Sequence, residues 1–128
     1  METDKRHILY LEDHDDSRTF TTFLLQRAGY QVTPVSTITE AQALLTSASD
    51  SDSQFDLYIL DYLLEDGAGT SLCQQIRTMD AHVPIVFVSG AVQNKDKQQA
   101  KDAGANAFIK KPVELQTLLD TVAELMQG

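Results

Sequence analysis

Leu57-Tyr-Ile-Leu60-Asp61 is the stretch that decides the fold, because four consecutive apolar residues run directly into an aspartate. A continuous apolar run of this length is typical of a strand that is buried on both faces of a parallel sheet. Ile85-Val-Phe-Val88 has the same character and ends at Ser89. The polar residue that ends each run does not stabilise an apolar core by packing, so these residues are candidates for function.

The other predicted strands also end in polar residues. We expect strands at 7–11, 31–35, 56–60, 84–88 and 106–109. The first runs into Glu12-Asp13 and the last into Lys110-Lys111-Pro112. Because the carboxyl ends of parallel strands meet at one edge of an open sheet, these side chains would gather there. The sequence therefore predicts a site for a divalent cation and a phosphoryl group.

Helical patterns alternate with the strands. Apolar residues at helical spacing predict five helices, the last of which opens at Pro112. In the first helix we expect one apolar face, which consists of Phe20, Phe23, Leu24 and Ala28. In the third helix the expected apolar stripe is Leu72, Ile76 and Met79. Five strands that alternate with five helices predict a three-layer α/β sandwich with right-handed crossovers.

The predicted fourth helix, at 94–104, differs from the others. Its apolar residues are Ala100 and Ala103, among many charged and amide side chains. Burial of a large aliphatic side chain contributes about 1.5–3 kcal/mol, and burial of alanine contributes far less. We therefore expect this helix to be the least firmly docked of the five, which leaves open a merely exposed helix or an element able to shift.

Composition narrows the classes of function. The 128 residues, with a hydrophobic fraction of 42%, suit one globular domain that spans 1–128, and we expect no output domain. A net charge of −9 argues against direct binding of nucleic acid. No apolar run reaches the roughly 18 residues of a membrane span, and the polar start lacks a signal peptide, so we expect a cytoplasmic protein. Cys73, the single cysteine, excludes an internal disulfide.

Four segments resemble the receiver domain of two-component response regulators. They are ILYLED at 8–13, DLYILDYLLEDGAG at 56–69, VPIVFVSGA at 83–91 and GANAFIKKPVE at 104–114. Any one of these segments is weak evidence for the family, but four of them in the right order across nearly the whole chain are specific evidence. The resemblance implies a flavodoxin-like (βα)5 fold, with a parallel five-stranded sheet of order 2-1-3-4-5.

The resemblance also implies a role for each strand-end residue. Asp61 would be the phosphoacceptor, and the ligands of Mg²⁺ would be Asp13, Asp61, Glu12 through a water, and the backbone carbonyl of Leu63. Ser89 and Lys111 would bind the phosphoryl oxygens. Ser89 and Phe108 would form the switch. Leu63 and Ala91, two positions beyond Asp61 and Ser89, would tune the lifetime of the phosphoryl group.

By the same resemblance, the phosphoryl donor is a histidine kinase or a histidine phosphotransfer protein. Phosphotransfer is self-catalysed, autodephosphorylation is slow, and the domain is not an enzyme in the sense of turnover. The output is a changed interaction with an effector or output domain through the fourth helix, fifth strand and fifth helix. Membrane binding is not implied, and a phosphorylation-dependent dimer stays open.

Two other functions remain open at this point. A phosphatase that forms an aspartyl-phosphate on a similar α/β sheet would need a second aspartate two positions after the nucleophile, where this chain has Leu63. An unphosphorylated pseudo-receiver would act as an interaction module only, and the full set of acids, hydroxyl and lysine argues against it.

Overall fold

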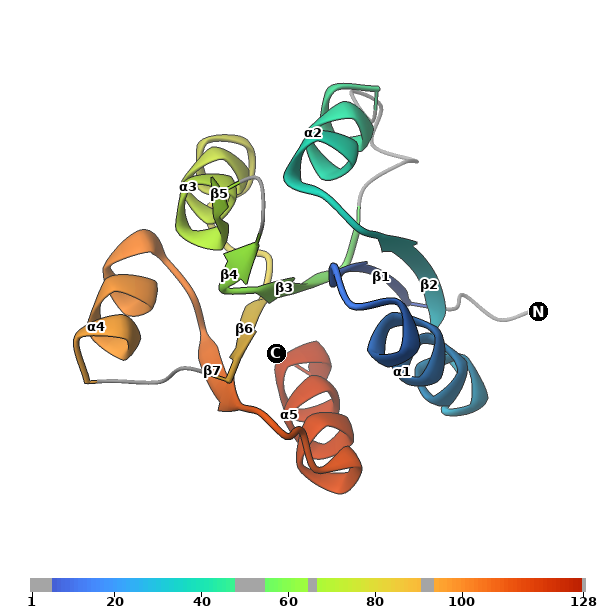
Figure 1. Cartoon of the computed structure of the whole chain (residues 1–128). Coiled ribbons are helices and arrows are strands. Elements are labelled where there is room, and N and C mark those ends of the chain that lie inside the picture. The colour runs from blue at the N-terminus through green and yellow to red at the C-terminus, as the bar shows by residue number, and fades with distance from the viewer. Residues whose placement is uncertain (1–5, 48–54, 65–66, 91–93, 128) are drawn as a thin grey trace.

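The computed structural model describes residues 6–47, 55–64, 67–90 and 94–127. Its centre is a parallel five-stranded sheet of order β2-β1-β3-β6-β7 (Figure 1). The strands are β1 (His7–Leu11), β2 (Gln31–Val35), β3 (Leu57–Asp61), β6 (Ile85–Ser89) and β7 (Ala107–Lys110). In chain order this is 2-1-3-4-5, so the predicted flavodoxin-like topology is confirmed, and each predicted strand bound lies within one residue of the observed one.

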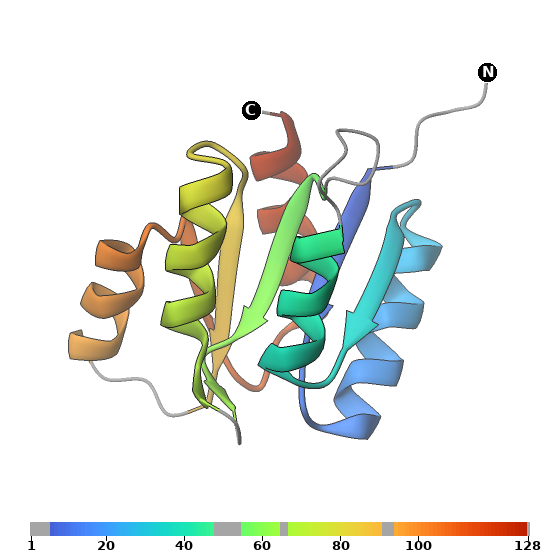
Figure 2. The same ribbon diagram turned by 90° about the horizontal axis from the view of Figure 1, so that it is seen from above.

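Helices cover both faces of the sheet. On one face lie α1 (Asp15–Arg27) and α5 (Leu115–Gln127), and on the other lie α2 (Ile38–Ser47), α3 (Gly69–Met79) and α4 (Asn94–Ala103) (Figure 1). Seen from above, the strands run side by side in one direction between the two helical layers (Figure 2). The predicted three-layer sandwich is therefore correct, and all carboxyl ends of the strands lie at the same edge.

The core consists of two clusters, one on each side of the sheet. Alternate strand residues belong to opposite clusters, because successive side chains of a strand point to opposite faces. In β1, Leu9 belongs to the same cluster as Leu72 of α3, whereas Ile8 belongs to the same cluster as Leu118 of α5. All five residues of β3 and of β6 are buried. These two central strands hold Asp61 and Ser89 rigidly at the edge.

A short antiparallel pair of strands follows β3, which the sequence did not predict. It pairs β4 (Leu63–Leu64) with β5 (Gly67–Ala68). The backbone N–H of Gly69 then donates to the carbonyl of Tyr62 at 2.8 Å. The chain thus turns back close to Asp61 before α3 begins.

The predicted apolar face of α1 is wrong. Phe20 is 64% exposed and Phe23 is 52% exposed, whereas Leu25 is completely buried. Met79, which was expected in the stripe of α3, is 54% exposed. The physical reason is that a helix with apolar residues on several sides has more than one possible stripe, and its docking angle against the sheet selects one of them.

The structure confirms the weak apolar anchoring of α4, whose buried residues are Ala100 and Ala103. Cys73 is buried in α3, as expected of a small core residue, and its thiol contacts the carbonyl of Ala103 at 3.3 Å. Among the helices of the described ranges, none is long and apolar enough to cross a membrane.

Candidate functional site

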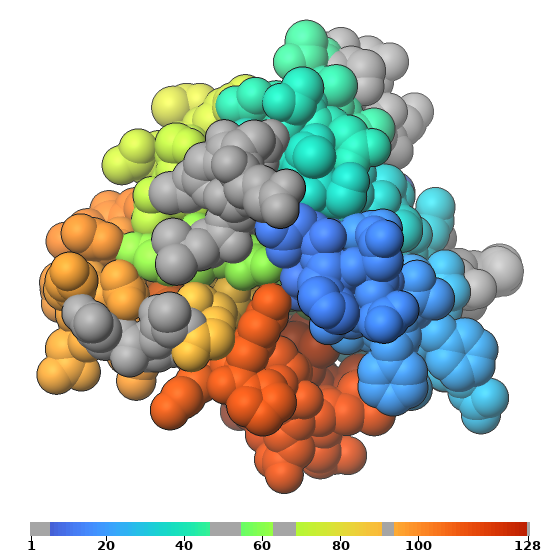
Figure 3. Space-filling model, viewed as in Figure 1, coloured from blue at the N-terminus to red at the C-terminus, as the bar shows by residue number. Residues whose placement is uncertain are grey.

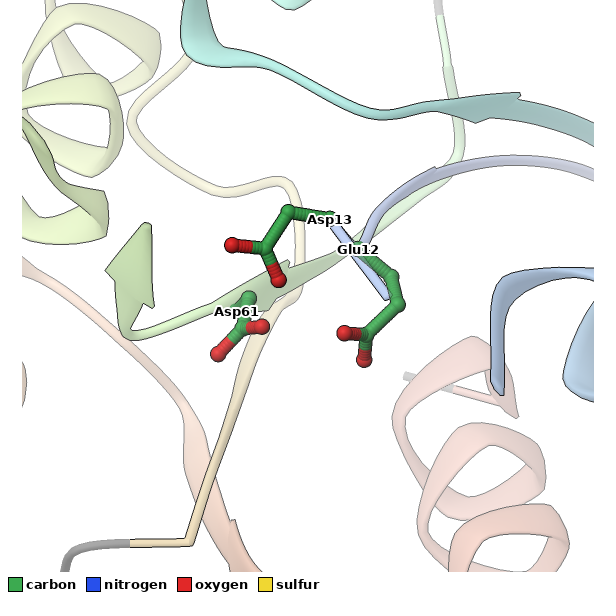
Figure 4. Close-up of side chains that lie close together, drawn as sticks. All are labelled: Glu12, Asp13 and Asp61. Atoms are coloured by element: carbon green, nitrogen blue, oxygen red, sulfur yellow. The ribbon is translucent and has the colours of Figure 1, made fainter. Parts of the chain in front are cut away.

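Three carboxylates meet at the carboxyl edge of the sheet. Glu12 and Asp13 follow β1, and Asp61 ends the neighbouring β3. One carboxylate oxygen from each lies within 4.8 Å of the other two (Figure 4). Glu12 and Asp61 are 2% and 5% exposed, whereas Asp13 is exposed. In space-filling view, the N-terminal, central and C-terminal parts of the chain converge on this face (Figure 3).

Sheet hydrogen bonds continue past the strand ends and fix the backbone of the site. The N–H of Glu12 donates to the carbonyl of Val35 at 3.0 Å, and the N–H of Tyr62 donates to the carbonyl of Val88 at 2.9 Å. Register pairs Asp61 with Val88, so Ser89 lies one residue further along the adjacent strand. Ser89 is 2% exposed. The predicted acids and the predicted hydroxyl residue are therefore neighbours.

Lys111 brings a positive charge to the carboxylates from beyond β7. Its Nζ lies 3.0 Å from Oε1 of Glu12 and 3.3 Å from Oδ2 of Asp61. Its backbone N–H donates to the carbonyl of Ser89 at 2.8 Å, and its bond to Pro112 is cis. Lys111 therefore contacts Glu12, Asp61 and Ser89, although up to 99 positions separate these residues in sequence.

Burial and charge shift the pKa values of this cluster. Burial raises the pKa of Asp61 to about 7, since the neighbouring charge of Glu12 adds to it and the attraction of Lys111 only partly opposes it. Burial alone would lower the pKa of Lys111, but the hydrogen bonds and charges of Glu12 and Asp61 outweigh it and raise that pKa. Two buried carboxylates thus share one ammonium, and Asp61 binds a proton more readily than an ordinary aspartate.

This donor set fits a magnesium ion. Mg²⁺ prefers hard oxygen ligands, is held by one or two carboxylates and keeps several waters. The cluster of Glu12, Asp13 and Asp61 supplies three carboxylates that could hold it. Two like charges ~4 Å apart at an effective dielectric constant of ~20 repel by about 4 kcal/mol, so a cation would relieve a substantial repulsion.

Residues that the sequence reasoning missed hold Glu12 in place. The N–H of His14, the N-cap of α1, donates to Oε2 of Glu12 at 3.1 Å. Arg18 donates to the backbone carbonyl of Glu12 at 2.9 Å and pairs with Asp15. Burial raises the pKa of the nearby Tyr10, and the charge of Glu12 adds to the rise. No short motif marks these partners, because each depends on how α1 packs against β1.

The remaining predicted residues lie close by or outside the described ranges. Phe108, the second residue of β7, is half-buried, and its ring lies 5.4 Å from that of Tyr62. Leu63 begins β4, two residues after Asp61. Ala91 lies outside the described residues. The roles of Leu63 and Ala91 stay predictions.

Sequence comparison identifies the relatives of the chain. The family model of the response regulator receiver domain matches residues 8–123. The sensory/regulatory protein RpfC of Xanthomonas campestris pv. campestris (strain ATCC 33913) is 32% identical over 92% of this chain, which spans 16% of that protein. The transcriptional regulatory protein CssR of Bacillus subtilis is 28% identical over 94% of this chain, which spans 51% of CssR. The chain therefore spans about half or less of the length of these relatives.

Solved structures of similar fold are themselves receiver domains. A CheY-like receiver domain protein from Methanospirillum hungatei JF-1 has a TM-score of 0.88 and 26% identity, and the match covers 97% of this chain and 95% of that one. The non-phosphorylated HemR receiver domain from Leptospira biflexa has a TM-score of 0.85 and 27% identity, with 97% and 96% covered. The match of sequence, fold and strand order leads to one conclusion: the chain belongs to the response regulator receiver domain family of two-component systems.

Proposed function

We propose that this receiver domain accepts a phosphoryl group on Asp61 in a Mg²⁺-dependent reaction and thereby switches its interactions with other proteins. The observation that supports this is the meeting of three carboxylates and the Lys111 ammonium at one edge of the sheet. Asp61 is the best-placed nucleophile, because it ends the central strand β3, lies within reach of both other acids and contacts Lys111.

In the transfer step, a carboxylate oxygen of Asp61 forms a bond to phosphorus while the bond from phosphorus to the donor atom breaks. The reactive form of Asp61 is the ionised carboxylate. Bound Mg²⁺ would neutralise charge that develops on the phosphoryl oxygens. Lys111 and Ser89 contact those oxygens, as a point charge and as a hydroxyl donor. The donor is a phosphohistidine of a histidine kinase or a phosphotransfer protein.

The switch runs from Ser89 to Phe108 and on to the face formed by α4, β7 and α5. Phosphorylation draws the Ser89 hydroxyl towards Asp61, and Phe108 fills the space that it leaves. Shifting a two-state equilibrium from about 1:99 to 99:1 requires about 5.5 kcal/mol of differential interaction. One charge-assisted bond from Ser89 and the Lys111 contact supply a part of this. An effector, an output domain or a second phosphorylated copy supplies the rest.

Exposure to a small-molecule phosphodonor with Mg²⁺ tests the proposal. We expect intact mass spectrometry to show one added phosphoryl group in the wild type and none in Asp61→Asn, with chelation of Mg²⁺ abolishing the reaction. Asp56→Asn is the matched control, since Asp56 lies at the opposite end of β3, where it accepts from the N–H of His7 at 2.8 Å. Equal labelling of wild type and Asp61→Asn would refute the assignment, and sustained turnover of the donor would favour a phosphatase.

A further inference from the structure

Tyr62 directly follows Asp61 in the chain, and its side chain reaches α4. Tyr62 is only 4% exposed, and its hydroxyl donates a hydrogen bond of 2.7 Å to Oε1 of Gln99 in α4. Its own backbone is fixed on both sides, by the N–H that donates to Val88 and by the carbonyl that accepts from Gly69. Any rearrangement around Asp61 therefore acts on a residue that reaches directly into α4.

The ring of Tyr62 also contacts the proposed switch residue. It packs edge-on against Phe87 at 5.5 Å and tilted against Phe108 at 5.4 Å between ring centroids. Protein interiors are close-packed, so a ring that loses a packing partner tends to shift into the space left behind. A movement of Phe108 into the space that Ser89 leaves would remove a packing partner of Tyr62 and so change the position of Tyr62.

Further contacts of α4 lie towards its carboxyl end. Its buried apolar residues are Ala100 and Ala103, which provide little hydrophobic stabilisation. Hydrogen bonds at its carboxyl end join Cys73 to Ala103 and Arg77 to Gly104. These contacts hold α4 to α3, whereas the bond from Tyr62 holds it to the edge where the phosphoryl group would sit.

We propose that the hydrogen bond between Tyr62 and Gln99 is a tether through which the state of Asp61 sets the position of α4. In the unmodified protein the tether keeps α4 docked over Tyr62. When Phe108 turns inward, the Tyr62 ring shifts and its hydrogen bond to Gln99 breaks. The helix α4 is then free to bind a partner. This inference rests on the proposed phosphorylation of Asp61.

Hydrogen exchange of the α4 amides tests the tether in the full chain, with and without Mg²⁺ and beryllofluoride, which mimics a phosphoryl group. Tyr62→Phe removes the hydroxyl alone, and Gln99→Ala removes the acceptor from an exposed position without emptying the core. Tyr58→Phe is the control for the first variant, since Tyr58 is similarly buried near the other end of β3. Gln98→Ala is the control for the second, since Gln98 bonds within α4, to Asp102.

We expect α4 to exchange roughly two- to twelvefold faster in Tyr62→Phe and in Gln99→Ala than in the wild type, as loss of one hydrogen bond implies. The double variant should be no faster than either single one, because both remove the same bond. Beryllofluoride should accelerate α4 exchange in the wild type and in both controls, and much less in the two tether variants.

Three results would overturn the tether while leaving phosphorylation intact. They are α4 exchange in the tether variants that equals the controls, effects of the two variants that simply add, and an undiminished response to beryllofluoride. If the wild type fails to bind beryllofluoride in a manner that depends on Asp61, the proposed function itself is wrong. Fluorine NMR of the bound beryllofluoride separates these two failures.

Discussion

Lys111 and Asp61 lie 3.3 Å apart, yet the pKa of Asp61 is raised to about 7 and not lowered as an ion pair would suggest. The reason is that burial of Asp61 raises its pKa more than the attraction of Lys111 lowers it, and the nearby charge of Glu12, which Lys111 also contacts at 3.0 Å, adds to the rise. One ammonium is thus divided between two carboxylates. The unmodified site is electrostatically unfavourable at neutral pH. Binding of a proton or of Mg²⁺ at the site should therefore change the free energy of unfolding.

The stability of the metal-free protein should fall as pH rises through the pKa of Asp61. The pKa of Asp61 is about 7 in the folded state, against a reference pKa of 3.8 in the unfolded chain. The stabilisation is therefore complete below pH 3.8 and lost as pH rises through about 7. At pH 8 in EDTA, Asp61→Asn should be more stable than the wild type by about 2–4 kcal/mol in urea unfolding. A wild type that is the more stable protein at pH 8 would contradict this.

Magnesium should stabilise the folded state at pH 8. A ligand that binds only the folded protein contributes about 2.7 kcal/mol at a concentration of 100 times its Kd. The rise in Tm with added Mg²⁺ should saturate, and Asp13→Asn should weaken it strongly. Asp16→Asn is the control, because Asp16 is exposed in the first turn of α1, outside the three-acid cluster. Equal shifts in both variants would count against the proposed site.

Replacement of Lys111 by methionine should destabilise the protein at pH 8. Glu12, 2% exposed, would lose its cationic partner, and an uncompensated buried charge is costly. Because the Lys111 side chain is 29% exposed, we expect a loss of about 1–3 kcal/mol in the free energy of unfolding. Lys110→Met, at the exposed neighbouring position, should have little effect. Similar losses in the two variants would contradict the bridging role of Lys111.

Gly69 should tolerate no side chain. A Cβ there would lie 2.5 Å from the carbonyl oxygen of Asp61 and 2.7 Å from the ring of Phe87. Gly69→Ala should therefore displace Asp61, lower stability by about 1–3 kcal/mol and weaken Mg²⁺ binding. Gly90→Ala is the matched control, since its Cβ would meet Lys111 at an ordinary 3.8 Å. Urea unfolding and Mg²⁺ titration of both variants check this, and an unperturbed Gly69→Ala would refute it.

Dephosphorylation without a partner should be slow. Leu63 and Ala91 have no side-chain group that can orient an attacking water by a hydrogen bond. The purified phosphoprotein in Mg²⁺ should therefore keep its phosphoryl group for many minutes, and Leu63→Asn should shorten this time. Mass spectrometry over time measures both rates, and a wild-type half-life of seconds would sink the hypothesis.

The sequence predicted the sheet well because β3 and β6 are buried on both faces. Such strands read as continuous apolar runs, and the polar residue that ends each run marks the edge of the sheet. The pattern of apolar runs alone therefore places Asp61, Ser89 and Lys111 at one edge. Their individual chemical roles came from the family resemblance and not from the pattern.

What the sequence could not predict depends on packing between elements that are far apart in the chain. Phe20 and Phe23 obey helical spacing, but the docking of α1 buries Leu25 instead. The bond from Tyr62 to Gln99 joins residues 37 positions apart, and no local pattern encodes it. The β4–β5 pair consists of two residues in each strand, too few for an alternating pattern to be recognised.

The span of 99 positions between Glu12 and Lys111 has a consequence for synthesis of the protein. Chains emerge from the ribosome from the N-terminus onward, and contacts between residues far apart in sequence are slow to form. The acids are therefore made long before the lysine that offsets them, and β7 must join the sheet to deliver it. A nascent or misfolded chain thus lacks the complete cluster of Glu12, Asp61 and Lys111.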